Sequence, residues 1–84
     1  MIGKFATSKA GHDQSKLYVI VAEEGDFVYV CDGKYKTVAK PKKKRKKHIQ
    51  IIDCTVEEEL FGKLLRGESV RDEQIKYALK NMKL

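Results

Sequence analysis

Short apolar and alternating segments fill the first two thirds of the chain. The segments "LYVIVAE" at 17–23 and "FVYVC" at 27–31 are rich in β-branched and aromatic residues, and the turn "EEGD" at 23–26 links them. Together they predict a β-hairpin. Weaker strand patterns occur at 4–9, 35–40 and 48–53. Five short strands at a spacing of about ten residues favour a small barrel.

The pattern changes to helical spacing after residue 54. Thr55 lies three residues before Glu58, which predicts a capping box, and Gly67 is placed to end this short helix. A second helix is expected from near Asp72. The apolar positions of the two helices are Leu60, Phe61, Leu64 and Leu65, followed by Ile75, Ala78, Leu79 and Met82. We therefore expect a mainly β protein, with a five-stranded barrel over residues 1–53 and a two-helix C-terminal extension over 54–84 that packs on it.

Composition limits the chain to one modest core. Its 84 residues carry a formal charge of +6, and that excess is uneven. Residues 1–53 hold twelve Lys and Arg against six Asp and Glu, whereas residues 54–84 hold six of each. A concentration of positive charge in one part of a small domain implies a polyanionic partner, such as nucleic acid, an anionic membrane surface or an acidic protein.

The sequence has no segment that resembles a signal peptide or a membrane span. Its longest apolar stretch, at 17–22, is too short to cross a bilayer. We expect a cytoplasmic protein that does not enter membranes. Cys31 and Cys54 show no paired spacing, and in that compartment they are expected to be free thiols.

The strongest candidate for function is the basic segment 34–47. It contains nine cations and no acid, and His48 follows it. Such a segment can contact phosphates and release their counterions, it can be a solvated loop that aids solubility, or it can meet an anionic membrane or protein. We favour phosphate contact, because flanking strands would fix where the charge points. The candidate residues are Lys34, Lys36, Lys40, Lys42, Lys43, Lys44, Arg45, Lys46, Lys47 and His48.

Two further features could add to such a site. Tyr18, Tyr29 and Tyr35 lie on expected strands and could stack on unpaired bases, although the strand pattern favours core or flanking positions for them. Tyr35 is nearest to the cations. The loop 9–16 could approach a phosphate or could be a plain connection. Its candidate residues are Lys9, Gly11, His12 and Lys16.

The segment 3–34 resembles a KOW motif, the short RNA-binding element of several ribosomal proteins and of transcription elongation factors of the NusG type. The matching residues are Gly3, Phe5, Gly11, Asp13 and Val19 to Val21. The continuation through residue 50 is similar to the eukaryotic-type large-subunit ribosomal protein fourteen family and its small bacterial relatives. The resemblance implies an SH3-like barrel of the KOW type that binds structured RNA, with ribosomal RNA the first candidate. It also favours a role in RNA binding for the loop 9–16 over a plain connection. Ser15 stands where the family usually has a second glycine.

Catalysis and metal binding are not expected. His12, Asp13 and His48 have no nucleophile at a recognisable spacing, and the two cysteines form no short ligand pair with a histidine. No cofactor is implied. We therefore expect an RNA-binding protein, with ribosomal proteins as possible further partners. The alternative is a protein-interaction adaptor that uses the barrel and a helical docking tail.

Overall fold

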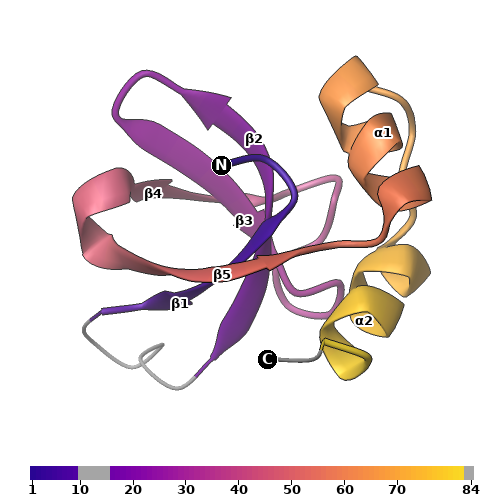
Figure 1. Cartoon of the computed structure of the whole chain (residues 1–84). Helices are drawn as coiled ribbons and strands as arrows, with labels where there is room; N and C mark the ends of the chain where they lie inside the picture. The colour runs from indigo at the N-terminus through magenta and orange to yellow at the C-terminus, as the bar shows by residue number, and fades with distance from the viewer. Residues whose placement is uncertain (10–15, 83–84) are drawn as a thin grey trace.

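The computed structural model describes residues 1–9 and 16–82. Within these residues, five strands precede two helices, so the expected mainly β architecture with a two-helix tail is confirmed (Figure 1). The elements are β1 (Lys4–Ser8), β2 (Leu17–Glu24), β3 (Phe27–Cys31), β4 (Lys42–Arg45), the 3-10 helix η2 (Lys46–His48), β5 (Ile49–Thr55), α1 (Glu58–Arg66) and α2 (Asp72–Lys80).

The five strands form one antiparallel sheet in the order β4-β3-β2-β1-β5. β4 and β5 are therefore the two edges, and η2 joins them directly. The sheet is open between these edges in the part of the chain that the structure describes. Figure 1 shows both helices on one side of the molecule and the η2 turn on the opposite side.

The predicted hairpin is confirmed by the pairing of β2 with β3. Gly25 begins the two-residue turn with a φ of 57°, which a glycine adopts without steric cost. The register shifts between Ile20 and Ala22, where a bulge leaves one residue unpaired. Beyond the bulge, Ala22 lies opposite Tyr29.

Side chains on the two faces of the sheet build two apolar clusters. One cluster consists of Ala6, Tyr18, Ile20, Val28, Val30 and Ile49. The other combines Phe5, Val19 and Cys31 of the sheet with Val56, Leu60, Leu64 and Ile75 of the C-terminal part. The apolar faces of α1 and α2 thus lie against the sheet, where burial of apolar surface stabilises their attachment.

The start of α1 differs from the prediction. Thr55 is the last residue of β5 and pairs with Lys4, so it does not cap the helix. Glu57 is the N-cap instead, and its side chain accepts a hydrogen bond from the Leu60 amide at 3.0 Å. The helix ends at Gly67, which has a φ of 69°, and α2 begins at Asp72. Both of these boundaries were predicted correctly.

The strand predicted at 35–40 is wrong, because a local hydrogen-bonded loop replaces it. Oδ1 of Asp32 accepts the backbone N–H groups of residues 34, 35 and 36 at 2.8, 2.9 and 2.8 Å. The amide of Val38 donates to Oδ1 of Asp72 at 2.8 Å. These amides are therefore bound by carboxylates rather than by a neighbouring strand.

Candidate nucleic-acid interface

Lys42 to Arg45 of the basic segment form the fourth strand of the sheet, whereas strands were expected only on either side of these cations. β4 consists entirely of cations, Lys42 to Arg45, and it pairs with β3 along its whole length. It begins directly after Pro41. β4 is an edge of the sheet. Its backbone, which carries the four cations, is held in register by β3 alone.

Pairing with β3 divides these cations between the two faces of the sheet. Lys43 and Arg45 lie opposite Tyr29 and Phe27, and residues directly opposite in an antiparallel pair share a face. The Nζ of Lys43 lies 4.3 Å from the centroid of the Phe27 ring, and the guanidinium carbon of Arg45 lies 5.1 Å from it. Phe27 therefore holds two cations close together through cation–π contacts.

The other two cations of β4 share a face with the first apolar cluster. Lys42 and Lys44 lie opposite Val30 and Val28. Lys44 is half-buried, and its Nζ lies 5.8 Å from the Tyr18 ring centroid. Lys42 is exposed. The stem of Lys44 thus covers apolar surface while its ammonium group stays at the edge.

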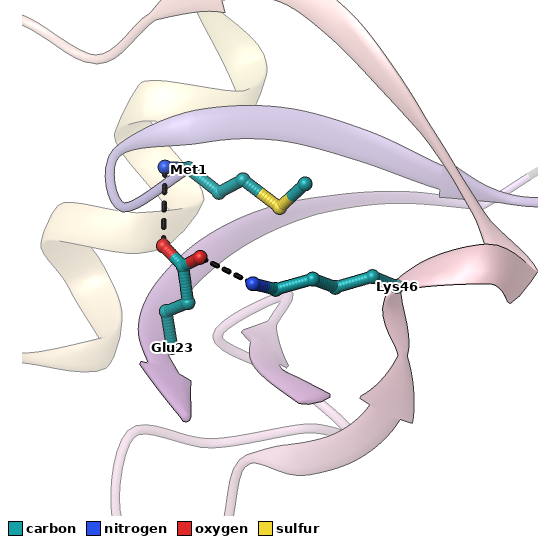
Figure 2. A network of polar contacts seen from close by, with 3 residues as sticks. All are labelled: Met1, Glu23 and Lys46. Atoms are coloured by element: carbon teal, nitrogen blue, oxygen red, sulfur yellow. Dashed lines mark hydrogen bonds and ion pairs between the residues drawn. The ribbon is translucent and has the colours of Figure 1, made fainter. Parts of the chain in front are cut away.

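Lys46, which was predicted from the sequence to contact phosphate, forms an ion pair within the protein. Its Nζ lies 2.5 Å from Oε2 of Glu23, and Oε1 of Glu23 lies 3.3 Å from the N-terminal ammonium group of Met1 (Figure 2). The hydrogen bond from Lys46, together with that from the N-terminus, lowers the pKa of the Glu23 carboxyl. The backbone N–H of Lys46 also donates to the Asp26 carbonyl at 2.8 Å. These contacts anchor the end of β4 to the β2–β3 turn.

The η2 turn lies beside the end of β1, so that Lys9 and His48, both predicted to contact RNA, are neighbours. The backbone N–H of Lys9 donates to the carbonyl of His48 at 2.9 Å. Lys9, Lys47 and His48 are all exposed. Lys9 therefore lies beside the end of the basic segment. Gly11 and His12, like Ser15, lie outside the described residues.

The loop 32–41 carries the remaining predicted cations and Tyr35. Burial of the Asp32 carboxyl raises its pKa, but the N–H groups of residues 34, 36 and 35 outweigh it, and the pKa is lowered overall. Tyr35 is 68% exposed. The Nζ atoms of Lys34 and Lys16 lie 5.1 and 5.4 Å from its ring centroid. Lys40 is exposed and Lys36 is half-buried.

The three tyrosines weighed as stacking residues have different environments. Tyr18 is fully buried in the first cluster, as the strand pattern favours. Tyr29 is half-buried, and Tyr35 projects into solvent. Only Tyr35 of these three exposes most of its surface to a ligand.

Two residues that contribute to the candidate site, Phe27 and Lys76, were missed in the sequence analysis. Phe27 organises Lys43 and Arg45, which only the register of β4 on β3 reveals. Lys76 of α2 lines a shallow pocket with Tyr35, Lys34 and Lys16. The apolar spacing of the tail indicated that α2 packs on the sheet, but it did not indicate which loop α2 would meet.

An apolar groove lies apart from these cations, between the start of α1 and α2. Its cavity measures about 730 Å³, and its lining includes Phe5, Val56, Leu60, Tyr77 and Met82. Glu57 and Glu73 also line it. The groove offers hydrophobic and acidic surface, so it does not suit a phosphate backbone.

The thiol and metal chemistry of the described part is limited. Burial raises the pKa of the Cys31 thiol to about 12, and the nearby carboxylates of Asp72 and Asp32 add to this effect. Cys31 Sγ lies 3.3 Å from the Thr37 carbonyl, to which the thiol donates. Neither cysteine forms a disulfide. Within residues 1–9 and 16–82, no three His, Cys, Asp or Glu side chains gather closely enough to hold a metal ion.

Neither described helix has the length and the apolar character needed to cross a bilayer. No family model matches the chain. A comparison with curated proteins also gives no match.

Proposed function

We propose that this chain is a KOW-type RNA-binding module that contacts the phosphate backbone of structured RNA. The observation that carries the proposal is β4, in which four consecutive cations are held in register on one edge of the sheet. Ribosomal RNA in the cytoplasm is the first candidate, as the resemblance of residues 3–50 implies. The five-stranded sheet is compatible with the barrel of that family.

Phosphate contact explains a charge arrangement that folding does not require. Adjacent cations repel one another, and the repulsion grows at low salt. Lysine on an edge strand can also prevent pairing with another sheet, but one or two such residues would suffice for that purpose. Lys47 and Lys9 extend the positive surface beyond β4. The phosphates of a bound RNA would neutralise these cations, and the release of counterions from the RNA would favour binding.

The experiment compares two double variants that remove the same charge. Lys42→Gln with Lys47→Gln alters exposed cations of the basic segment, whereas Lys63→Gln with Lys80→Gln alters cations of the helical tail. Binding of a fluorescent RNA hairpin is measured at one salt concentration. The first variant is expected to lose affinity, and the second is expected to resemble the wild type. Equal affinities for both variants would contradict the proposal, provided that both melt at the wild-type temperature.

The adaptor alternative would use a different surface. The apolar groove between α1 and α2 is the feature that suits a protein segment. Crosslinking in cells separates the two functions. RNA crosslinks within 34–48 support the RNA-binding proposal, whereas protein crosslinks at Tyr77 or Met82 without any RNA would favour the adaptor.

A further inference from the structure

The side chain of Tyr35 lies in the loop before β4, beside cations that do not belong to that strand. Its ring is 68% exposed. Two ammonium groups, those of Lys34 and Lys16, lie within 5.1 and 5.4 Å of the ring centroid. An exposed aromatic ring can stack on a base, and the ammonium groups that now lie over it can move to the attached phosphate.

The ring borders a shallow cavity of about 320 Å³, which we call the Tyr35 pocket. Its lining residues are Lys16, Leu17, Lys34, Tyr35, Lys76 and Leu79, together with Asp32. The leucines supply apolar surface, and the three lysines come from three separate segments of the chain. Among the described residues that line the pocket, Asp32 is the one acid, and its Oδ1 already accepts three backbone N–H groups. The pocket therefore combines apolar surface with an excess of positive charge.

The pocket is held in place before any ligand arrives. The hydrogen bonds to Asp32 fix the backbone that carries Lys34 and Tyr35. Gly33 packs directly on α2. A Cβ at this position would lie 2.6 Å from the Asp72 carbonyl oxygen, and the φ of Gly33 is +79°. The loop and the helix thus form one unit, and ordering the site on binding costs little conformational entropy.

We propose that the Tyr35 pocket binds an unpaired nucleotide of the RNA, with the base stacked on Tyr35 and the phosphate held by Lys16, Lys34 and Lys76. This inference rests on the proposed RNA-binding function and names its preferred substrate, a folded RNA with a single-stranded segment. A paired base cannot enter, because its faces are covered by its neighbours in the helix. The proposal also makes Lys76 of α2 part of the RNA interface.

The test uses the whole chain and two RNA probes. One is a single-stranded oligoadenylate that carries 2-aminopurine, and the other is an RNA duplex of matched length. Tyr35→Ala is compared with Tyr35→Phe, which keeps the aromatic ring. Lys76→Gln is compared with Lys80→Gln, a change on the same helix outside the pocket lining.

Stacking predicts a selective loss. Tyr35→Ala is expected to weaken single-strand binding about 5- to 140-fold, the effect of removing one aromatic–base stack. Quenching of 2-aminopurine fluorescence should disappear, duplex affinity should be unchanged, and Tyr35→Phe should behave as the wild type. Lys76→Gln is expected to make the salt dependence of single-strand binding shallower by about 0.7, while Lys80→Gln should not change it.

The outcomes separate this inference from the proposed function. If Tyr35→Ala binds both probes as the wild type does, or loses affinity equally for both, the stacking site is overturned. The RNA-binding proposal survives that result if Lys42→Gln with Lys47→Gln still loses affinity. If the wild type binds neither probe even at low salt, both proposals fail.

Discussion

Two adjacent leucines on α1 provide a matched test of how the helical tail is attached. Leu64 is 9% exposed and belongs to the cluster that contains Phe5 and Val19, whereas Leu65 is 56% exposed. Replacing either residue with alanine removes the same atoms from the same helix. Only the change at Leu64 leaves a cavity between α1 and the sheet. The difference in stability between the two variants therefore measures the packing of Leu64, because the change in helix propensity is the same in both.

The magnitude follows from burial. A Leu→Ala change in a core costs about 2–5 kcal/mol, and the slight exposure of Leu64 places it toward the lower end, about 2–3 kcal/mol. A chain of this size has a total stability of about 4–13 kcal/mol. Each kcal/mol shifts the melting temperature by about 4–8 °C, so Leu64→Ala should melt roughly 8–24 °C lower than the wild type. Leu65→Ala should stay within about 4 °C, because exposed substitutions change stability by about 0.5 kcal/mol or less.

The assay is thermal unfolding of both variants, followed by circular dichroism and by calorimetry. A single transition for Leu64→Ala at the lower temperature is the expected result. Equal and small shifts for the two variants would refute the packing of α1 on the sheet. A separate early transition confined to the helical signal would show that the tail unfolds independently of the sheet.

The remaining predictions concern the charges and the thiol. Lys47→Gln should weaken binding of an RNA hairpin more than Lys46→Gln, because the Glu23 carboxylate already pairs with Lys46. Equal losses of affinity would contradict the importance of this ion pair. The lowered pKa of Asp32 means that its contribution to stability is complete above its ordinary value of 3.8 and is lost as the pH falls through the lower folded value. Melting curves of Asp32→Asn should therefore show less acid sensitivity than the wild type below about pH 4, and parallel curves would oppose this. In a Cys54→Ser variant, Cys31 should resist a thiol reagent at about pH 8 until denaturant is added, since its pKa is about 12; rapid reaction in the folded state would show an accessible thiolate.

Sequence patterns were reliable where one local signal decided the structure. The β-branched runs at 17–23 and 27–31 flank a glycine turn, and both strands formed as predicted. The apolar spacing of the tail and the glycine at position 67 likewise predicted the end of α1 and the start of α2. In these segments, local preference and tertiary packing favour the same structure.

The basic edge strand could not be predicted from local pattern. Lys42 to Arg45 show no alternation of apolar and polar side chains, so nothing marks them as a strand until β3 is present to pair with them. The alternating residues 35–40 looked more like a strand, but Asp32 and Asp72 bind the amides that a sheet would need. Pairing with β3 decided the first segment, whereas the local hydrogen bonds to Asp32 and the long-range one to Asp72 decided the second.

In the candidate site, too, the sequence predicted local features and missed those that depend on tertiary contacts. The excess of cations between residues 34 and 47 was evident from the sequence, and so was the proximity of Tyr35 to them. The neutralisation of Lys46 by Glu23 depends on β2 and η2 meeting in space. The contribution of Lys76 depends on where α2 lies. Sequence could therefore name most of the cations, but it could not rank them.

The central claim is that the basic edge strand and its neighbours neutralise RNA phosphates. The most direct measurement is the affinity of the wild-type chain for an RNA hairpin, followed by fluorescence anisotropy over a series of salt concentrations. With about five phosphates neutralised, the logarithm of the association constant should fall against the logarithm of salt with a slope of about −3.5 to −4.5. A slope near zero, or no binding at the lowest salt, would contradict the account.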